Sequence, residues 1–330
     1  MQSFDLTHVM RADSALVMLM ALALEAALPQ SWVWQRLPHP VAIFGNLVDH
    51  ADRKLNRDSR SFGARMLRGA LVTIGLTAIA FGAGVLLDSL FRSIPHGWIG
   101  EAAVIIVMLA QRSLFEHVQR VERRLAAGYL NSARVAVGKI VGRDVNVLDE
   151  HGVARAAIES LAENFSDAVV SPMFWYLVLG LPGLLAFKAI STMDSMIGHL
   201  TPRHAAFGRV AARLDDAANF IPARLSALLL AIAAFCVPGG RPIVAIRTAL
   251  RDGHRHRSVN AGYPEAAAAG ALGLALGGPR SYGGETVVAP WLNDGGASAT
   301  VTDIRRALIL YVVACLANAM VVAGVLYLTL

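Results

Sequence analysis

Hydrophobic residues gather in six segments that polar and basic stretches separate: 14–28, 69–91, 102–110, 168–187, 225–237 and 307–330. A helix that crosses a membrane needs about 20 apolar residues. The second and sixth segments reach that length, and we expect the shorter ones to tilt, to pack inside the bundle or to enter without crossing. The pattern predicts an all-α, multi-pass transmembrane helical bundle, with cytoplasmic helical loops and some broken or re-entrant segments. We expect residues 1–330 to form a single integral membrane domain.

Composition and charge support a membrane protein. Of 330 residues, 55% are hydrophobic and 16% are charged, whereas soluble domains average about 45–50% apolar residues. The net charge is +6, but the Lys and Arg residues lie between apolar segments and form no patch interleaved with aromatics, so nucleic-acid binding is not favoured. Basic residues concentrate in 36–68, 112–155 and 241–306, and the positive-inside rule places these regions in the cytoplasm. The cytoplasmic polar regions thus cover about 36–68, 112–167 and 241–306. The short link 92–101 then lies outside, and an even number of crossings separates Arg155 from Arg241.

Two segments leave alternatives open. Residues 14–28 resemble a signal peptide, but Glu25 interrupts them, and we favour an uncleaved first span. The segment 168–187 contains Pro172, Gly180, Pro182 and Gly183, so we expect a break in its middle. A kinked span and a re-entrant hairpin are both consistent with this sequence, because freed backbone groups at membrane depth need protein or water around them.

The long region 241–306 predicts a mixture of short elements. Apolar residues at helical spacing in 242–251, with arginines opposite, favour a helix on the membrane surface. A second helix is expected to begin near Pro264 and to stop at Gly277–Gly278. Residues 285–291 predict a short extended piece. Cys236 and Cys315 both lie in apolar runs and have no CxxC partner, which indicates small buried hydrophobes.

Four acidic or amide side chains crowd into "ESLAENFSDA" just before an apolar segment. Glu159, Glu163 and Asp167 are four residues apart and would share one face of an α-helix, with Asn164 beside it. Like charges on one face repel unless a cation, a substrate or basic side chains separate them. We therefore predict that these four residues belong to a catalytic site.

A second polar group follows in "FKAISTMDSMIGH". Lys188 and Ser195 share one helical face, and Asp194 is next to it. Lys188 reaching the membrane interface is the alternative, but the polar residues continue for two turns. We predict catalytic roles for Lys188 and Asp194 and substrate or phosphate binding by Ser195.

The third group is "ARLDDAANFIPARL". Arg213 and Asp216 are three residues apart, which usually indicates a structural salt bridge. Two adjacent aspartates and an asparagine nevertheless suit Mg²⁺, which prefers oxygen ligands and keeps several waters. We predict a metal site at Asp194, Asp215 and Asp216, with phosphate or substrate bound by Arg213, Asn219 and Arg224.

The fourth group is "HRHRSVNAGYPEA", whose His and Arg residues suit an anion, although a solvated basic loop is an equal alternative. Within it we predict substrate-binding roles for Asn260, Tyr263 and Glu265. His39, between two prolines, more often marks a rigid turn than a ligand. The sequence contains no P-loop, no dinucleotide-binding glycine fingerprint, no HExxH and no nucleophile elbow.

These motifs resemble a known family. "GRDVNVLDEHGVARAAIESLAENFSDAVVSPMFW", "FKAISTMDSMIGH", "AARLDDAANFIPARLSALL" and "NAGYPEAAAAGALGLALGG…PWLNDG" closely resemble the adenosylcobinamide-phosphate synthase family of cobalamin biosynthesis (CobD/CbiB). The likeness runs, with gaps, from residue 37 to about residue 295. The chain departs from the family pattern at Glu25, where aspartate is usual, at Ala168 for glycine and at Ser191 for asparagine.

The resemblance implies a multi-pass enzyme of the bacterial inner membrane, with its site on the cytoplasmic side. Such an enzyme joins the propionate carboxylate of adenosylcobyric acid to (R)-1-amino-2-propanol or its O-phosphate, giving adenosylcobinamide or its phosphate. The family's class, an acid–amine ligase, implies ATP and Mg²⁺. A carboxylate must be activated before it condenses with an amine, and phosphates need cations nearby. Implied partners are these substrates, the lipid bilayer and other cobalamin-synthesis enzymes.

Two other functions compete with a ligase. A transporter is suggested by broken helices and charged residues near apolar segments, but it should carry an internal repeat, and the sequence has none. A non-catalytic scaffold for the pathway is the second alternative, and it would tolerate loss of Asp194 or Asp216.

Overall fold

The computed structural model describes residues 12–28, 40–282 and 285–330. Helices dominate, and in these residues β structure is limited to two ladders of two strands each and one isolated bridge between Leu274 and Ala297, which confirms the all-α prediction. Backbone contacts divide the chain into two compact units. Unit 1 comprises Met1–Leu109, Ser171–Asn219 and Val322–Leu330, and unit 2 comprises Ala110–Val170 and Phe220–Val321. The single integral membrane domain stays a prediction.

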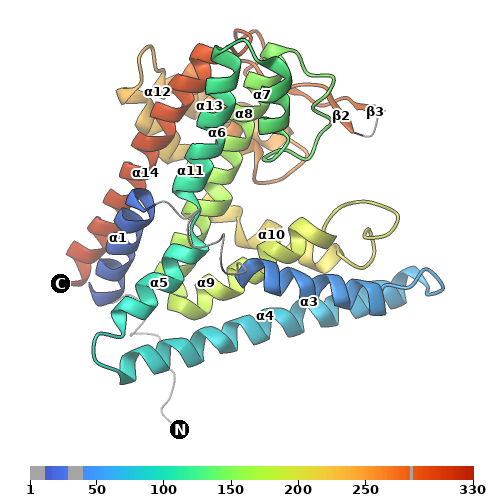
Figure 1. Cartoon of the computed structure of the whole chain (residues 1–330), viewed down its shortest axis with the longest axis vertical. Coiled ribbons are helices and arrows are strands. Elements are labelled where there is room, and N and C mark those ends of the chain that lie inside the picture. Colours follow the sequence, from blue (N-terminus) through green and yellow to red (C-terminus); the bar gives the residue numbers. More distant parts are fainter. Residues whose placement is uncertain (1–11, 29–39, 283–284) are drawn as a thin grey trace. The chain divides into compact units, whose positions relative to one another are not determined.

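In the described residues, unit 1 is built from six whole helices, of which the longest is apolar. They are α1 (Ala12–Ala27), α3 (Pro40–Leu55), α4 (Phe62–Ser93), α5 (Trp98–Met108), α9 (Ser171–Ile197) and α10 (Arg209–Ala218). α3 lies along α4, and α9 packs against both (Figure 1). Its core is made by Val48, Met193, Ile197, Phe207 and Ala211.

The predicted break in the fourth apolar segment is confirmed. Within α9, Gly180 has φ 65° and ψ −155°, which is not helical, and Pro182 follows two residues later. Helix α4 touches this break directly, because a Cβ on Gly84 would lie 2.4 Å from the Cα of Pro182. The break is therefore held by packing. A kinked span and a re-entrant hairpin both stay open.

Unit 2 surrounds one helix of small side chains, α13 (Gly262–Leu272). The other helical elements of unit 2 are α6 (Gln111–Ala126), α7 (Leu130–Val137), α8 (Glu150–Phe165), the π-helical turn η2 (Ser166–Val170), α11 (Phe220–Ala233), the short 3₁₀ turns η3 (Ala234–Cys236) and η4 (Gly253–Arg255), α12 (Pro242–Asp252) and the part of α14 (Val301–Thr329) that ends at Val321. Residues 264–272 are all buried, and α13 packs against α8, α11 and α12. The short side chains allow this: a Cβ on Gly270 would lie 2.7 Å from the Val244 carbonyl oxygen.

Four short strands follow α13 in a loop fixed to the helices. β1 (Leu276–Gly277) pairs with β4 (Trp291–Leu292), and β2 (Arg280–Tyr282) pairs with β3 (Glu285–Val287), both antiparallel. Buried Asp252 at the end of α12 accepts a hydrogen bond from the Asn293 backbone N–H at 2.8 Å. Asn293 also donates through Nδ2 to the Leu274 carbonyl at 3.0 Å. The extended piece predicted at 285–291 therefore corresponds to β3 and β4.

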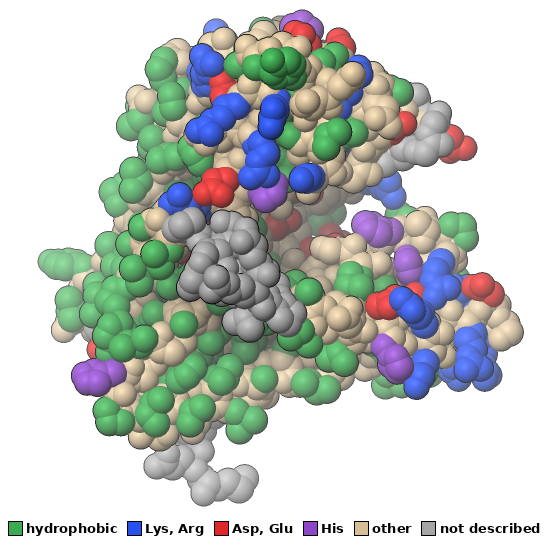
Figure 2. Space-filling model, in the orientation of Figure 1, with side chains coloured by type: hydrophobic (Ala, Val, Ile, Leu, Met, Phe, Trp, Pro, Cys, Tyr) green, Lys and Arg blue, Asp and Glu red, His purple; other side chains and the backbone are tan. Residues whose placement is uncertain are grey.

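Among the described residues, four helical stretches are long and apolar enough to cross a membrane: Phe62–Ser93, Trp98–Ala126, Glu150–Ile197 and Val301–Thr329. A fifth is possible if Arg209–Ala218 and Phe220–Cys236, bent by 45°, count as one span. Apolar side chains cover the visible face of α4, and basic ones gather where α3 turns into α4 (Figure 2). Together these features confirm the multi-pass architecture.

Three local expectations need correction. Helix α13 ends at Leu272, where Gly273 adopts φ 74°, so the predicted stop at Gly277–Gly278 was wrong. Cys236 is exposed and Cys315 is only partly buried, so the expectation that both are buried was wrong. Helix α1 covers 16 residues of the expected first span. The residues before it, and His39, lie outside the described residues, so that span stays a prediction. Finally, Asp167 lies in the π-helical turn η2, so the α-helical spacing from Glu159 does not extend to it.

Candidate functional site

Glu159 on α8 is the centre of a buried ionic cluster in unit 2. Its side chain is only 2% exposed, and its Oε2 pairs with Arg143 Nη2 and lies 3.4 Å from Arg280 Nη2. Its Oε1 accepts a hydrogen bond of 2.6 Å from the Gly277 N–H and lies 4.0 Å from Arg155 Nε. Arg155 is one turn earlier on α8. Helix, preceding loop and strands β1 and β2 thus each bring one group to the same carboxylate.

Glu265 in the first turn of α13 joins this cluster through Arg280. Arg280 Nη2 donates to Glu265 Oε2 at 3.2 Å, and His256 Nε2 lies 3.8 Å from Glu265 Oε1. Burial raises the pKa of Glu265 well above its ordinary value, and the negative charge of Glu159 adds to that effect, which outweighs the nearby Arg280. A carboxylate with a raised pKa is a stronger proton acceptor, which suits Glu265 to general-base chemistry.

His256 is a neutral neighbour of that carboxyl group. Burial lowers the pKa of His256 to about 4, and the charge of Arg280 acts in the same direction. Its Nδ1 accepts a hydrogen bond from the Ser258 N–H at 3.1 Å. A neutral ring that accepts at Nδ1 carries its proton at Nε2, on the side of Glu265. His256 therefore adds no positive charge beside Glu265 near pH 7 and is a weak base.

The glutamate–arginine cluster is defined by Arg143, Arg155, Glu159, Glu265 and Arg280. Arg155 also stacks on the Trp291 ring, with its guanidinium carbon 4.9 Å from the ring centroid. Glu163, one turn after Glu159, interacts electrostatically with the cluster. Asn164 instead donates to the Ser160 carbonyl at 2.9 Å and to its hydroxyl. Four residues were predicted from "ESLAENFSDA". Glu159 anchors the cluster, Glu163 borders it, Asn164 binds its own helix, and Asp167 lies in η2.

Arg224, Asn260 and Tyr263 come together elsewhere in unit 2. Arg224 lies between the rings of Phe220 and Tyr263, at 3.8 and 3.9 Å from their centroids. It donates to Asn260 Oδ1 at 2.7 Å and to the backbone carbonyls of Phe220 and Val259. These contacts explain Arg224 as a structural clamp between α11 and α13. The predicted roles of the three residues in substrate binding stay predictions.

The aspartates of unit 1 form a second polar group. Asn219 donates through Nδ2 to Asp215 Oδ2 at 2.9 Å and accepts at Oδ1 from the Ser171 hydroxyl at 2.6 Å. Asp194 interacts electrostatically with both Asp215 and Asp216. Asp194, Asp215 and Asp216 make up the aspartate group. This group belongs to unit 1, whereas Glu159 and Glu163 belong to unit 2, so their meeting in one site stays a prediction.

The other predicted residues of unit 1 are more exposed. Arg213 Nη1 lies 3.6 Å from Asp216 Oδ2 in a largely exposed ion pair, as the salt-bridge alternative expects. Ser195 is exposed and donates to the Ser191 carbonyl at 2.9 Å. Lys188 is half-buried on α9, and its carbonyl accepts from the Thr192 hydroxyl at 2.6 Å.

The aspartate group fits a metal ion only in part. Among the described residues, no three His, Cys, Asp or Glu side chains are arranged to hold a metal ion. Asp215 Oδ1, however, is buried and makes no hydrogen bond within the described part of the chain. Mg²⁺ keeps several waters and often takes only one or two carboxylates from the protein. Such an ion would need few protein ligands here, and a Mg²⁺ site at these aspartates stays a prediction.

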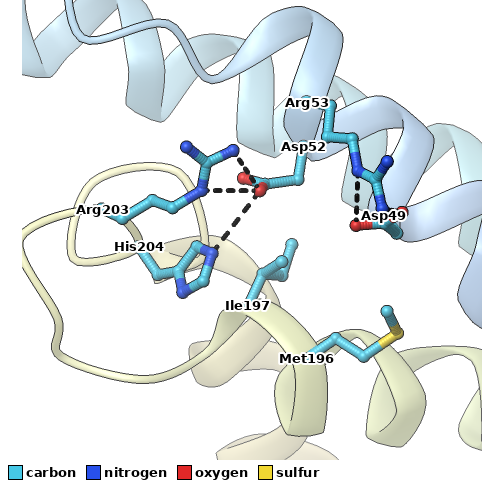
Figure 3. A pocket seen from close by; sticks show the side chains of 7 residues that line it. All are labelled: Asp49, Asp52, Arg53, Met196, Ile197, Arg203 and His204. Atoms are coloured by element: carbon cyan, nitrogen blue, oxygen red, sulfur yellow. Dashed lines mark hydrogen bonds and ion pairs between the residues drawn. The ribbon is translucent and has the colours of Figure 1, made fainter.

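Unit 1 also contains a pocket of about 360 Å³, lined by Asp49, Asp52, Arg53, Met196, Ile197, Arg203 and His204 (Figure 3). Buried Asp52 accepts two hydrogen bonds from Arg203, at 2.9 and 2.6 Å, and one from Asn56 at 2.6 Å. These contacts hold the loop after α9 against α3. The polar walls are satisfied by one another, so the pocket is chiefly a structural junction.

Sequence reasoning missed three arginines of the glutamate–arginine cluster. Arg155 could have been found, because it stands four residues before Glu159 on the same helix face. Arg143, in a loop, is 16 residues from Glu159 along the chain, and Arg280, in the short strand β2, is 121 residues away. Neither has a regular spacing that would indicate the contact. The only hint was the Gly-Gly-Pro-Arg sequence, which indicates a turn that ends in a cation.

Comparisons with known proteins identify the family of the chain. The family model described as CobD/Cbib protein matches residues 18–311. A protein of Rhizobium meliloti (strain 1021) named "Cobalamin biosynthesis protein CobD" is 48% identical over 310 residues, 93% of this chain and 95% of its own. Proteins of the same name from Brucella melitensis and Rhodobacter capsulatus are 49% and 43% identical, covering 84% and 90% of this chain and 86% and 92% of their own.

No solved structure matches the chain. The family model nevertheless covers nearly all of the described sequence, including both polar groups. This protein belongs to the CobD/Cbib family.

Proposed function

We propose that this protein is an acid–amine ligase of cobalamin biosynthesis, located in the bacterial inner membrane with its site on the cytoplasmic side. It would join the propionate carboxylate of adenosylcobyric acid to (R)-1-amino-2-propanol or its O-phosphate. Family membership supports the pathway, since relatives of similar length are named for cobalamin biosynthesis. The observation that carries the chemistry is the buried Glu265, whose raised pKa suits it to take a proton from an amine.

The reaction has two parts that need different groups. The substrate carboxylate would first take the γ-phosphoryl group of ATP, with the bond to the β-phosphate oxygen breaking and ADP leaving, which turns one carboxylate oxygen into part of a leaving group. The amine nitrogen then attacks the acyl carbon, the bond to the phosphate oxygen breaks, and inorganic phosphate leaves. The attacking nitrogen loses one proton, and Glu265 is the group that we propose to accept it.

The surroundings of Glu265 fit this role. Arg280 donates a hydrogen bond to one oxygen of Glu265, and the other oxygen, 3.8 Å from neutral His256, is left to accept the proton. Burial excludes water that would otherwise hydrolyse an activated acyl group. If Mg²⁺ binds at the aspartate group, it would neutralise phosphate charge.

The test is the conservative substitution Glu265→Gln, with Glu285→Gln as the control. Glu285 is exposed on β3, so its amide should be silent. Removing a general base typically lowers turnover by about 10²–10⁴-fold, and we expect that loss only in Glu265→Gln at an unchanged melting temperature. Amide formation at the wild-type rate in folded Glu265→Gln would remove Glu265 from the mechanism.

A further inference from the structure

Two guanidinium groups of the glutamate–arginine cluster have donors that Glu159 does not use. The Arg143 side chain is 6% exposed, and its Nη1 is buried without a hydrogen bond in the described part of the chain. Arg155 Nε is likewise buried without a hydrogen bond there, since its 4.0 Å contact with Glu159 is too long for one. An unsatisfied buried donor is destabilising, and more so when it is charged. An acceptor that reaches these donors would remove that destabilisation.

The charges of the cluster point to an anionic acceptor. Three guanidinium groups, of Arg143, Arg155 and Arg280, surround the Glu159 carboxylate. The other acidic neighbours are Glu163 and Glu265, and the neighbouring His256 is neutral near pH 7. Glu265 accepts its hydrogen bond from Arg280, so Arg143 and Arg155 have one carboxylate, that of Glu159, within ion-pair distance in the described part of the chain. Two largely buried guanidinium groups on one carboxylate leave positive charge without a close partner, which is costly unless an anion binds.

We propose that Arg143 and Arg155, with the charge of Arg280, form a binding site for a phosphoryl group. One guanidinium fork satisfies a carboxylate, whereas the donors of two arginines, one on a loop and one on a helix, suit the three outer oxygens of a phosphoryl group. The inference rests on the proposed function, in which a phosphoryl group arrives on ATP or on the amino alcohol. The site would bring that group beside Glu265.

The experiment measures binding of inorganic phosphate to the full-length protein in detergent, by titration calorimetry, with acetate as the carboxylate comparison. The design starts from Glu159→Gln, which removes the salt bridge of Arg143 and leaves its guanidinium in place. Adding Arg143→Gln to that variant then tests whether Arg143 binds phosphate, with the ion pair to Glu159 already gone. Arg257→Gln, on an exposed residue of the neighbouring loop, is the matched control.

We expect Glu159→Gln to bind phosphate at least as tightly as the wild type does. Acetate should bind this variant more weakly than phosphate does. Arg143→Gln in that background should weaken phosphate binding by at least about tenfold, while Arg257→Gln should not change it. Equal phosphate affinity with and without Arg143 would overturn the proposal, because Arg143 would then serve Glu159 only. So would an absence of phosphate binding, which would mean that water alone fills the space.

Two further arms keep the test decisive. If Glu159→Gln does not fold, Arg155→Gln in the wild-type background replaces it, with the same tenfold loss expected. Competition of the phosphate probe by ATP or by (R)-1-amino-2-propanol O-phosphate identifies the source of the phosphoryl group. Phosphate binding needs no turnover, so a protein that binds phosphate through Arg143 but forms no amide contradicts the proposed function and not this site.

Discussion

Replacing Gly277 by alanine should break the hydrogen bond between strand β1 and Glu159. Gly277 has φ 77°, a conformation that costs a residue with a Cβ about 1–2 kcal/mol. Its new Cβ would lie 2.7 Å from the Pro290 carbonyl oxygen, so the backbone has to move. That movement takes the Gly277 N–H away from Glu159 Oε1, at present 2.6 Å away. A hydrogen bond to a charged group contributes about 1.5–3 kcal/mol. The two losses together come to about 2.5–5 kcal/mol.

Gly295→Ala is the matched control for this experiment. Gly295 has a similar φ of 82°, but a Cβ there meets nothing within 4 Å, so it carries only the conformational cost. Chemical unfolding of both variants in detergent, with amide formation measured alongside, separates the two effects. We expect Gly277→Ala to be less stable than Gly295→Ala by about 1.5–3 kcal/mol and to lose activity. Equal stability of the two variants would refute the role of the Gly277 N–H at Glu159.

The remaining predictions concern the aspartate group, pH and topology. Asp216→Asn should abolish ligation because it removes a charge from the predicted metal site. The protein should stay folded, since the exposed pair of Asp216 with Arg213 contributes at most about 1 kcal/mol; a wild-type rate would exclude Asp216 from the site. The pKa of His256 is lowered to about 4 from its ordinary 6.5, so its stabilising contribution is complete above about pH 6.5 and is lost as pH falls toward 4. His256→Gln should therefore flatten the melting temperature between these pH values, and an unchanged pH profile would contradict the neutral buried ring. Cysteine introduced at Arg255, with exposed Cys236 and with Cys315 replaced by alanine, should resist an impermeant maleimide from outside the cell; labelling there would contradict a cytoplasmic 241–306.

The sequence predicted features with a local cause. Long apolar runs predicted α4 and α14, and the Gly and Pro residues around Gly180 predicted the break, because a missing donor and an unusual φ act where they stand. The end of α13 was misplaced because either Gly273 or Gly277–Gly278 could stop a helix. Only packing decides that the second pair turns toward Glu159.

The candidate site was less predictable for the same reason. Glu159 and Glu265 were identified by their cost in an apolar setting, which the sequence displays directly. Their partners were not, since Arg280 reaches both carboxylates from a loop whose path depends on Asp252 and Asn293. The spacing from Glu159 to Asp167 also misled, because the π-helical turn changes the register between them.

Purified protein in lipid bilayers, supplied with adenosylcobyric acid, ATP, Mg²⁺ and either (R)-1-amino-2-propanol or its O-phosphate, tests the central claim most directly. Mass spectrometry should detect adenosylcobinamide or its phosphate, and adenosylcobyric acid whose propionate carboxylate carries ¹⁸O should transfer one ¹⁸O atom to the released phosphate. Folded protein that leaves adenosylcobyric acid unchanged with both amines would contradict the ligase and favour a scaffold or a transporter.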